Sequence, residues 1–194
     1  MHDAYTSTPA GEPLLGQGVA RAAVYLVRDP RDVAVSLAYH NSTTIDDAIK
    51  LMNTANGSFG GGRKGLGPQL RQKLMGWSGH VTSWLDQTGV PVHIVRYEDL
   101  VAAPIECFSP ALGFTGRPAT TAEIERAVCH ADFAELQRQE GEKGFAQRMS
   151  RTAPFFRSGR VGGWRDSLTA AQADAIEQCH GVVMARLGYG VKTG

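Results

Sequence analysis

Cysteine is scarce in this sequence. Cys107, Cys129 and Cys179 are the three among 194 residues, and none forms a CxxC pair with another. The odd count and wide spacing argue against a disulfide framework, a zinc ribbon or a redox pair, so we expect reduced thiols. His130 and His180 directly follow two of them, but adjacent helical residues diverge by about 100° and do not converge on one ion. We therefore expect no metal site.

Long apolar runs and an excess of one charge are also missing. No stretch approaches the roughly 20 apolar residues that span a bilayer, and residues 1–20 lack the order of a signal peptide. The 20 Lys and Arg residues against 19 Asp and Glu leave a net charge of +1, which argues against nucleic-acid binding. We expect a cytoplasmic protein with no membrane span and no nucleic-acid partner, in which any anion site is local. The length and the 42% of hydrophobic side chains predict one domain over residues 1–194.

Two short apolar runs predict strands. Residues 22–27 and 90–96 are rich in β-branched and aromatic side chains, which is typical of strands buried on both faces of a parallel sheet. Asp29 and Pro30 predict that a helix begins after the first run, because Asp caps free amides and Pro suits the first helical position. Strands that alternate with helices indicate an α/β fold.

Periodicity and capping residues predict further helices over residues 44–52, 68–88, 97–102, 121–129 and 170–187. Thr169 and Gln172 form a capping box before the last of these. Pro104 and Pro110 interrupt residues 103–118, for which no element is predicted. Residues 138–163 are polar and rich in glycine, and we expect mostly loop there.

A glycine-dense segment, residues 56–67 (NGSFGGGRKGLG), superficially resembles a phosphate loop. It contains no GxxxxGK[ST] register, since Gly62 precedes Arg63 and Lys64 precedes Gly65. We predict a loop or an active-site lid instead. Without such a register or paired magnesium carboxylates, a kinase or another P-loop phosphotransferase is a poorer alternative.

Both predicted strands end in arginine, at Arg28 and Arg96, and ligands of α/β sheets bind beyond the carboxyl ends of the strands. The run YLVRDPRDVAVSLAYH, residues 25–40, closely resembles the segment with which cytosolic-type sulfotransferases bind the 3′-phosphate of their donor. That donor is 3′-phosphoadenosine 5′-phosphosulfate (PAPS). The resemblance implies that Arg28 and Ser36 contact the phosphate. Ser36 stands about 10 Å along the helix, so the phosphate would lie on the helix flank.

A second run, FRSGRVGGWRD over residues 156–166, resembles the C-terminal motif of the same family. Arg157 and Gly159 fit that motif, as do Gly162 and Trp164. Ser158 departs from it, because lysine is usual at that position, and Gly163 replaces an aspartate. The resemblance implies that residues 157–159 bind the donor, with weaker electrostatics and a retained loop shape.

Three smaller matches follow the same order along the chain. Tyr97, within RYEDL, corresponds to a tyrosine that approaches the adenine in the family, and Phe133 to an aromatic residue that stacks on it. His2, within MHDAY, corresponds to the catalytic histidine. A group of near-neutral pKa suits the removal of the acceptor's proton.

The resemblance implies a three-layer, P-loop-NTPase-like sulfotransferase fold with a parallel sheet, truncated at its N-terminus. It implies transfer of a sulfuryl group from PAPS to a hydroxyl or amine of a small-molecule acceptor. The family's glycine-bearing loop for the donor's 5′ end has no counterpart in the sequence. Three alternatives stay open: a gene fragment, a pseudoenzyme that binds 3′,5′-bisphosphoadenosine (PAP) without turnover, and a site completed by another chain or by a second copy in a homodimer.

Overall fold

A computed structural model describes residues 3–16, 18–59, 72–145 and 154–191, and all structural statements below refer to these ranges. Strands β1 (Ala23–Val27) and β4 (Val92–Arg96) pair in parallel, with Ala23 opposite Val92 and Val27 opposite Arg96. The parallel α/β arrangement predicted from the two apolar runs is confirmed. Strand β2 (Ser58–Phe59) pairs separately with β3 (Gln72–Lys73) in antiparallel fashion.

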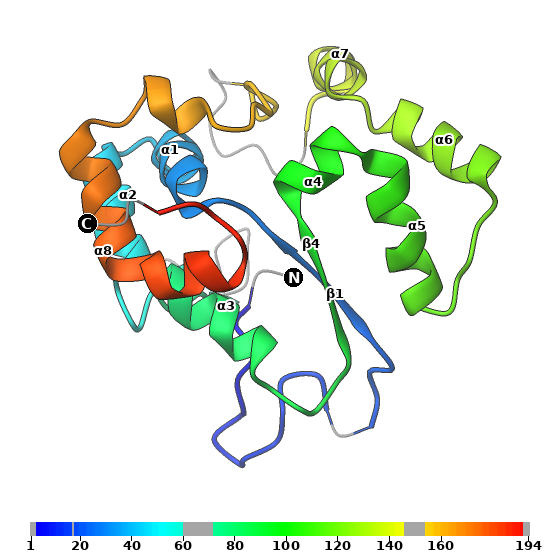
Figure 1. Ribbon diagram of the computed structural model, residues 1–194, viewed down its shortest axis with the longest axis horizontal. Helices are drawn as coiled ribbons and strands as arrows, with labels where there is room; N and C mark the ends of the chain where they lie inside the picture. The colour runs from blue at the N-terminus through cyan, green and yellow to red at the C-terminus, as the bar shows by residue number, and fades with distance from the viewer. Residues whose placement is uncertain (1–2, 17, 60–71, 146–153, 192–194) are drawn as a thin grey trace.

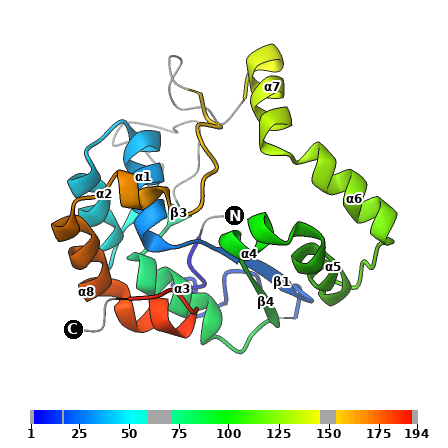
Figure 2. The same ribbon diagram turned by 45° about the horizontal axis from the view of Figure 1, so that its top comes forward.

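Helices lie on both sides of the parallel pair (Figure 1). One group contains α1 (Pro30–Asn41), α2 (Ile45–Met52), α3 (Trp77–Leu85) and α8 (Ala170–Arg186). The other contains α4 (Tyr97–Ala102), α5 (Pro104–Phe114), α6 (Thr121–His130) and α7 (Phe133–Lys143). Figure 2 shows that α6 and α7 extend away from the sheet. A short 3₁₀ helix, η1 (Gly163–Asp166), precedes α8.

The core lies on the α8 side of the sheet. Val27 of β1 packs with Val81 of α3 and with Met184 of α8 in one cluster of buried side chains. A second cluster joins Ala34 of α1 and Ile176 of α8, both with no exposed surface, to α2. Close packing of this kind fixes α1, and therefore the end of β1, relative to the sheet.

The opposite face of β1 is open, although burial on both faces was predicted. Val24 and Leu26 are 45% and 55% exposed. Within the described residues β1 pairs with β4 alone. On that face α5 packs against β4, where the Phe114 ring lies 5.4 Å from that of His93. The apolar pattern of β1 was read correctly as a strand, but its burial was not.

The helix predicted over residues 68–88 is wrong at its start. Helix α3 begins at Trp77, after Gly76 at the N-cap position and after Met75, which has a φ of 58°. A Cβ on Gly76 would lie 2.7 Å from the carbonyl oxygen of Met52, so close packing between backbones decides this boundary. Most of the glycine-dense segment, residues 60–67, lies outside the described residues.

Two segments are more helical than predicted. Helix α5 fills residues 104–114, with Pro104 at its first position, where no N–H is needed, and Pro110 inside it. Helix α7 continues to Lys143, into the predicted loop over residues 138–163. The predicted capping box of Thr169 and Gln172 is confirmed at α8.

No helix in the part of the chain that the structure describes is both long and apolar enough to cross a membrane.

Candidate donor-binding site

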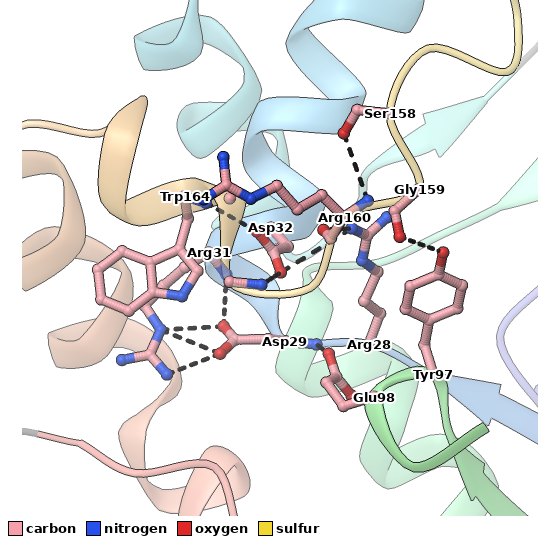
Figure 3. Close-up of polar contacts among 12 residues, drawn as sticks. Arg28, Asp29, Arg31, Asp32, Tyr97, Glu98, Ser158, Gly159, Arg160 and Trp164 are labelled. Carbon is pink, nitrogen blue, oxygen red and sulfur yellow. Dashed lines mark hydrogen bonds and ion pairs between the residues drawn. The ribbon is translucent and has the colours of Figure 1, made fainter. Parts of the chain in front are cut away.

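The turn between β1 and α1 places Arg28 at the carboxyl end of the sheet (Figure 3). Asp29 caps α1 by accepting a hydrogen bond from the Arg31 backbone N–H at 2.9 Å, and Pro30 takes the first helical position, as predicted. The Arg28 guanidinium stacks on the Tyr97 ring, with Cζ 4.4 Å from its centroid. Because Tyr97 follows β4 directly, the two strand ends meet at this stack.

The guanidinium of Arg28 is only partly satisfied by protein groups. Its Nη2 donates to the carbonyl oxygen of Arg160 at 2.8 Å and lies 3.8 Å from Oδ2 of Asp32. Its Nε is buried and has no hydrogen-bond partner among the described residues. A buried N–H of a charged group is costly to leave unpaired, and an anionic oxygen is its strongest acceptor. The arrangement therefore fits a phosphate at this edge of the sheet.

Gly159 joins Tyr97 to Phe133. The Tyr97 hydroxyl donates to the carbonyl oxygen of Gly159 at 2.7 Å. Gly159 has a φ of +56°, and a Cβ there would lie 2.6 Å from Cδ2 of Phe133. The ring of Phe133, the first residue of α7, thus packs against a backbone that only glycine permits at this distance.

One cavity of about 730 Å³ adjoins these groups. Its volume is in the range of sites for nucleotides and other small ligands. Seven of the eight predicted site residues border it: Arg28, Ser36, Tyr97, Phe133, Arg157, Ser158 and Gly159. The eighth, His2, lies outside the described residues. Segments far apart in the sequence therefore converge on a single cavity.

Arg157 and Ser158 lie at the outer rim of the cavity and are exposed. The Arg157 guanidinium stacks on Tyr39 of α1, with Cζ 4.9 Å from the ring centroid. The Ser158 Oγ accepts from the backbone N–H of Arg160 at 3.3 Å. The rim thus has one cation and one hydroxyl where the family motif has two cations.

The remaining wall of the cavity is largely apolar and includes Leu37, Leu51 and Trp77. His80 is a polar residue of this wall, and its Nδ1 lies 2.8 Å from the hydroxyl of Tyr25, which does not itself border the cavity. Burial raises the pKa of Tyr25, so its phenol stays protonated at neutral pH. The sequence had not indicated this pair, because Tyr25 reads simply as an apolar strand residue.

Two buried carboxylates near the cavity were also missed. Asp32 of α1 accepts from the backbone N–H groups of Gly162 at 2.7 Å and Trp164 at 2.9 Å. Glu140 of α7 accepts from those of Phe155 and Phe156, at 2.5 Å and 2.9 Å. For Asp32 the signal was a second acid within the DPRD run. Glu140 lay in a segment that was predicted to be loop.

A buried ion network lies behind the site (Figure 3). Arg31 donates to both carboxylate oxygens of Asp29 and to Glu177 of α8 at 2.7 Å, and its Cζ lies 4.3 Å from the Trp164 ring. Glu98 of α4 accepts from the backbone N–H of Asp29 at 2.9 Å. The turn that carries Arg28 is thus fixed to helices on both sides of the sheet.

Across the four described ranges, no group of three or more His, Cys, Asp or Glu residues could hold a metal ion.

Comparisons with known proteins give the same family. The sulfotransferase domain family matches residues 22–188. "Cytosolic sulfotransferase 13" of Arabidopsis thaliana is 30% identical over 165 residues, which are 80% of this chain and 49% of that protein. "Sulfotransferase 2B1" of Homo sapiens is 27% identical over 162 residues, which are 81% of this chain and 42% of that protein. The chain thus spans about half the length of the curated relatives it matches.

Solved structures share the fold. The mouse sulfotransferase SULT7A1 complexed with PAP aligns with a TM-score of 0.60 at 19% identity, over 84% of this chain and 58% of that one. Retinol dehydratase in complex with retinol and PAP aligns with a TM-score of 0.59 at 21% identity, over 88% and 49%. With the match over residues 22–188, this chain belongs to the sulfotransferase domain family.

Proposed function

We propose that the chain binds the PAP moiety of PAPS in the 730 Å³ cavity and takes part in sulfuryl transfer to a hydroxyl or amine of a small-molecule acceptor. The observation that carries this proposal is the convergence of seven residues, each chosen for its place in a family motif, on one cavity. The match to the sulfotransferase domain family and the PAP in two structural neighbours support it.

The residues divide into two groups by chemistry. Arg28, Ser36 and Arg157 supply cations and a hydroxyl toward the 3′-phosphate, where a guanidinium fork suits a dianion. The Tyr97 and Phe133 rings would flank the adenine, since aromatic faces stack on bases. The backbone of the 157–159 segment would complete the phosphate contacts.

Transfer breaks the bond between sulfur and the bridging phosphate oxygen and forms a bond from sulfur to the acceptor atom. PAP leaves, and the proton of the acceptor goes to a base. We propose His2 as that base, because imidazole titrates near neutral pH. Cations near the leaving phosphate would stabilise its developing charge. We place the acceptor against the apolar wall with Trp77 and against His80, whose imidazole contacts the hydroxyl of Tyr25 behind it.

A second candidate is nucleotide binding without turnover. It requires the residues placed at the PAP site, Arg28, Ser36 and Arg157, and no group that binds the donor's 5′ end. The two candidates share the PAP site and differ in the chemistry that follows.

Calorimetric titration of the chain with PAP tests the shared site. We expect saturable binding by the wild type and no detectable binding by Arg28→Ala, since the variant loses several charge-assisted hydrogen bonds. Arg186→Ala is the matched control, because Arg186 pairs with Asp86 on the surface and does not border the cavity. Unchanged binding by Arg28→Ala, with its fold verified by circular dichroism, would refute the assignment.

A transfer assay with labelled PAPS and a panel of phenol, alcohol and amine acceptors separates the two candidates. His2→Ala is expected to keep the wild-type affinity for PAP and to abolish transfer. Wild-type protein that binds PAP but transfers to none of the acceptors, alone or with a supplied second chain, would favour the binding-only candidate.

A further inference from the structure

The segment from Phe155 to Trp164 carries three of the candidate donor-binding residues but has almost no regular structure of its own. It lies between α7 and α8 and ends in the first turn of η1. Phosphate-binding loops without secondary structure must be held by other contacts, because ordering about ten free residues costs on the order of 10 kcal/mol. Here buried carboxylates hold both ends of the segment.

Asp32 holds the C-terminal end. Asp32 is 4% exposed, and each of its two carboxylate oxygens accepts a hydrogen bond from one backbone N–H, that of Gly162 or that of Trp164. It stands one helical turn after Arg28, in the first turn of α1, and lies 3.8 Å from the Arg28 guanidinium. The same carboxylate therefore touches the segment and the arginine that faces it.

Glu140 holds the N-terminal end in the same way. Glu140 is 6% exposed, and its two carboxylate oxygens accept hydrogen bonds from the consecutive backbone N–H groups of Phe155 and Phe156. Gln137, one turn earlier in α7, donates to the carbonyl oxygen of Phe156 at 2.8 Å. The helix that presents Phe133 at its start thus also fixes the segment that packs on Phe133.

We propose that Asp32 and Glu140 are positioning residues, which clamp the segment in its binding geometry before the nucleotide arrives. This inference rests on the proposed function. Arg157, Ser158 and Gly159 lie between the two clamped ends, and the Tyr97 hydroxyl bonds the middle of the segment at Gly159. Because the ordering cost is met during folding, it does not weaken donor binding.

A positioning role and a purely electrostatic role of Asp32 predict opposite changes in PAP affinity. A carboxylate 3.8 Å from Arg28 repels a bound phosphate, so its removal would tighten PAP binding if only its charge mattered. If it positions the segment, its removal weakens PAP binding. The sign of the change in affinity therefore distinguishes the two roles of Asp32.

The test compares the PAP affinity of Asp32→Asn and Asp32→Ala with that of the wild type by calorimetry. Asn keeps one acceptor oxygen and Ala keeps none. We expect affinity to fall about tenfold in Asp32→Asn and about a hundredfold in Asp32→Ala, as for the loss of one and two hydrogen bonds to a charged group. If both variants bound PAP with the wild-type affinity, or more tightly than the wild type, the proposal would be overturned.

Two control variants separate positioning from charge and from stability. Asp166→Asn removes an equal charge near the cavity, from an exposed side chain that pairs with Arg160, and should bind PAP at least as tightly as the wild type. Ile176→Val weakens the core between α1 and α8 without touching the segment, so it should lower the melting temperature and leave the affinity unchanged. If Ile176→Val also lost affinity tenfold, the effect of Asp32 would be one of stability, and the proposal would fail.

Two further measurements decide the matter if the Asp32 variants do not fold. Glu140→Gln keeps one acceptor at the other end and should also lose affinity about tenfold. In the wild type without nucleotide, hydrogen exchange should show protected amides at Gly162 and Trp164. Fast exchange there in the free protein would refute a preformed clamp. Failure of the wild type itself to bind PAP would refute the proposed function instead.

Discussion

Acid should destabilise this protein through His180, which lies on α8 and is 4% exposed. Its Nδ1 is 2.8 Å from the hydroxyl of Ser78, and its Nε2 is buried without a hydrogen-bond partner among the described residues. Burial lowers the pKa of His180 to about 4, because the imidazolium would lose its hydration. The unfolded chain therefore binds a proton at pH values where the folded chain does not.

The sign and size of the effect follow from linkage. With a pKa of about 4 in the folded state and 6.5 in the unfolded state, the free energy of unfolding is unaffected above about pH 7 and falls as the pH is lowered. At about 1.4 kcal/mol per pKa unit, the loss is about 2 kcal/mol at pH 5 and about 3 kcal/mol at pH 4.

Urea unfolding followed by tryptophan fluorescence measures this loss, since the Trp77 ring lies 5.5 Å from that of His180. Wild type and His180→Gln are compared from pH 7.5 to pH 5. Gln can still bond Ser78 but does not titrate, so the other ionisable groups cancel in the difference. We expect the difference in unfolding free energy between the two proteins to change by about 2 kcal/mol over this range. A difference that stays constant with pH would refute the reasoning.

Two further predictions concern stability near the site. Gly159→Ala should lower the free energy of unfolding by at least about 2 kcal/mol and weaken PAP binding, because of its positive φ and the contact with Phe133; Gly141→Ala, in open space on α7, should instead stabilise by about 0.5–1 kcal/mol in the same thermal melts. Arg31→Met should cost about 3–5 kcal/mol because it leaves Asp29 buried without its partner, and Arg31→Lys, which keeps the charge, should cost less in urea titrations. A stable Gly159→Ala, or an Arg31→Met as stable as the wild type, would contradict these assignments.

Local rules predicted much of the fold. The two strands, the N-cap of α1 at Asp29 and the capping box of α8 depend on neighbouring residues, and each was confirmed. The start of α3 depends on a contact between Gly76 and Met52, which are distant in sequence. The helical state of residues around Pro110 likewise required tertiary packing that outweighs the missing hydrogen bond.

The candidate site was predicted through motifs, and its supports were not. Arg28, Ser36 and Gly159 stand in recognisable runs, and the structure places them at one cavity. Asp32 and Glu140 accept from backbone N–H groups, which carry no residue identity, so the partners of these carboxylates could not be read from the sequence. That the shared face of β1 and β4 would be half open could not be read from the apolar pattern of β1 itself.

The open face of β1 also has consequences for how the chain behaves at high concentration. Residues 23–27 contain no charged side chain and no proline, the features that keep exposed edge strands from pairing with other molecules. Val24 and Leu26 add an apolar surface beside that edge. Self-association through this strand would lower the yield of folded monomer and would lower the fraction of protein that binds PAP in a titration. Replacing Leu26 with threonine introduces the β-branched side chain that strands favour and makes the surface less apolar.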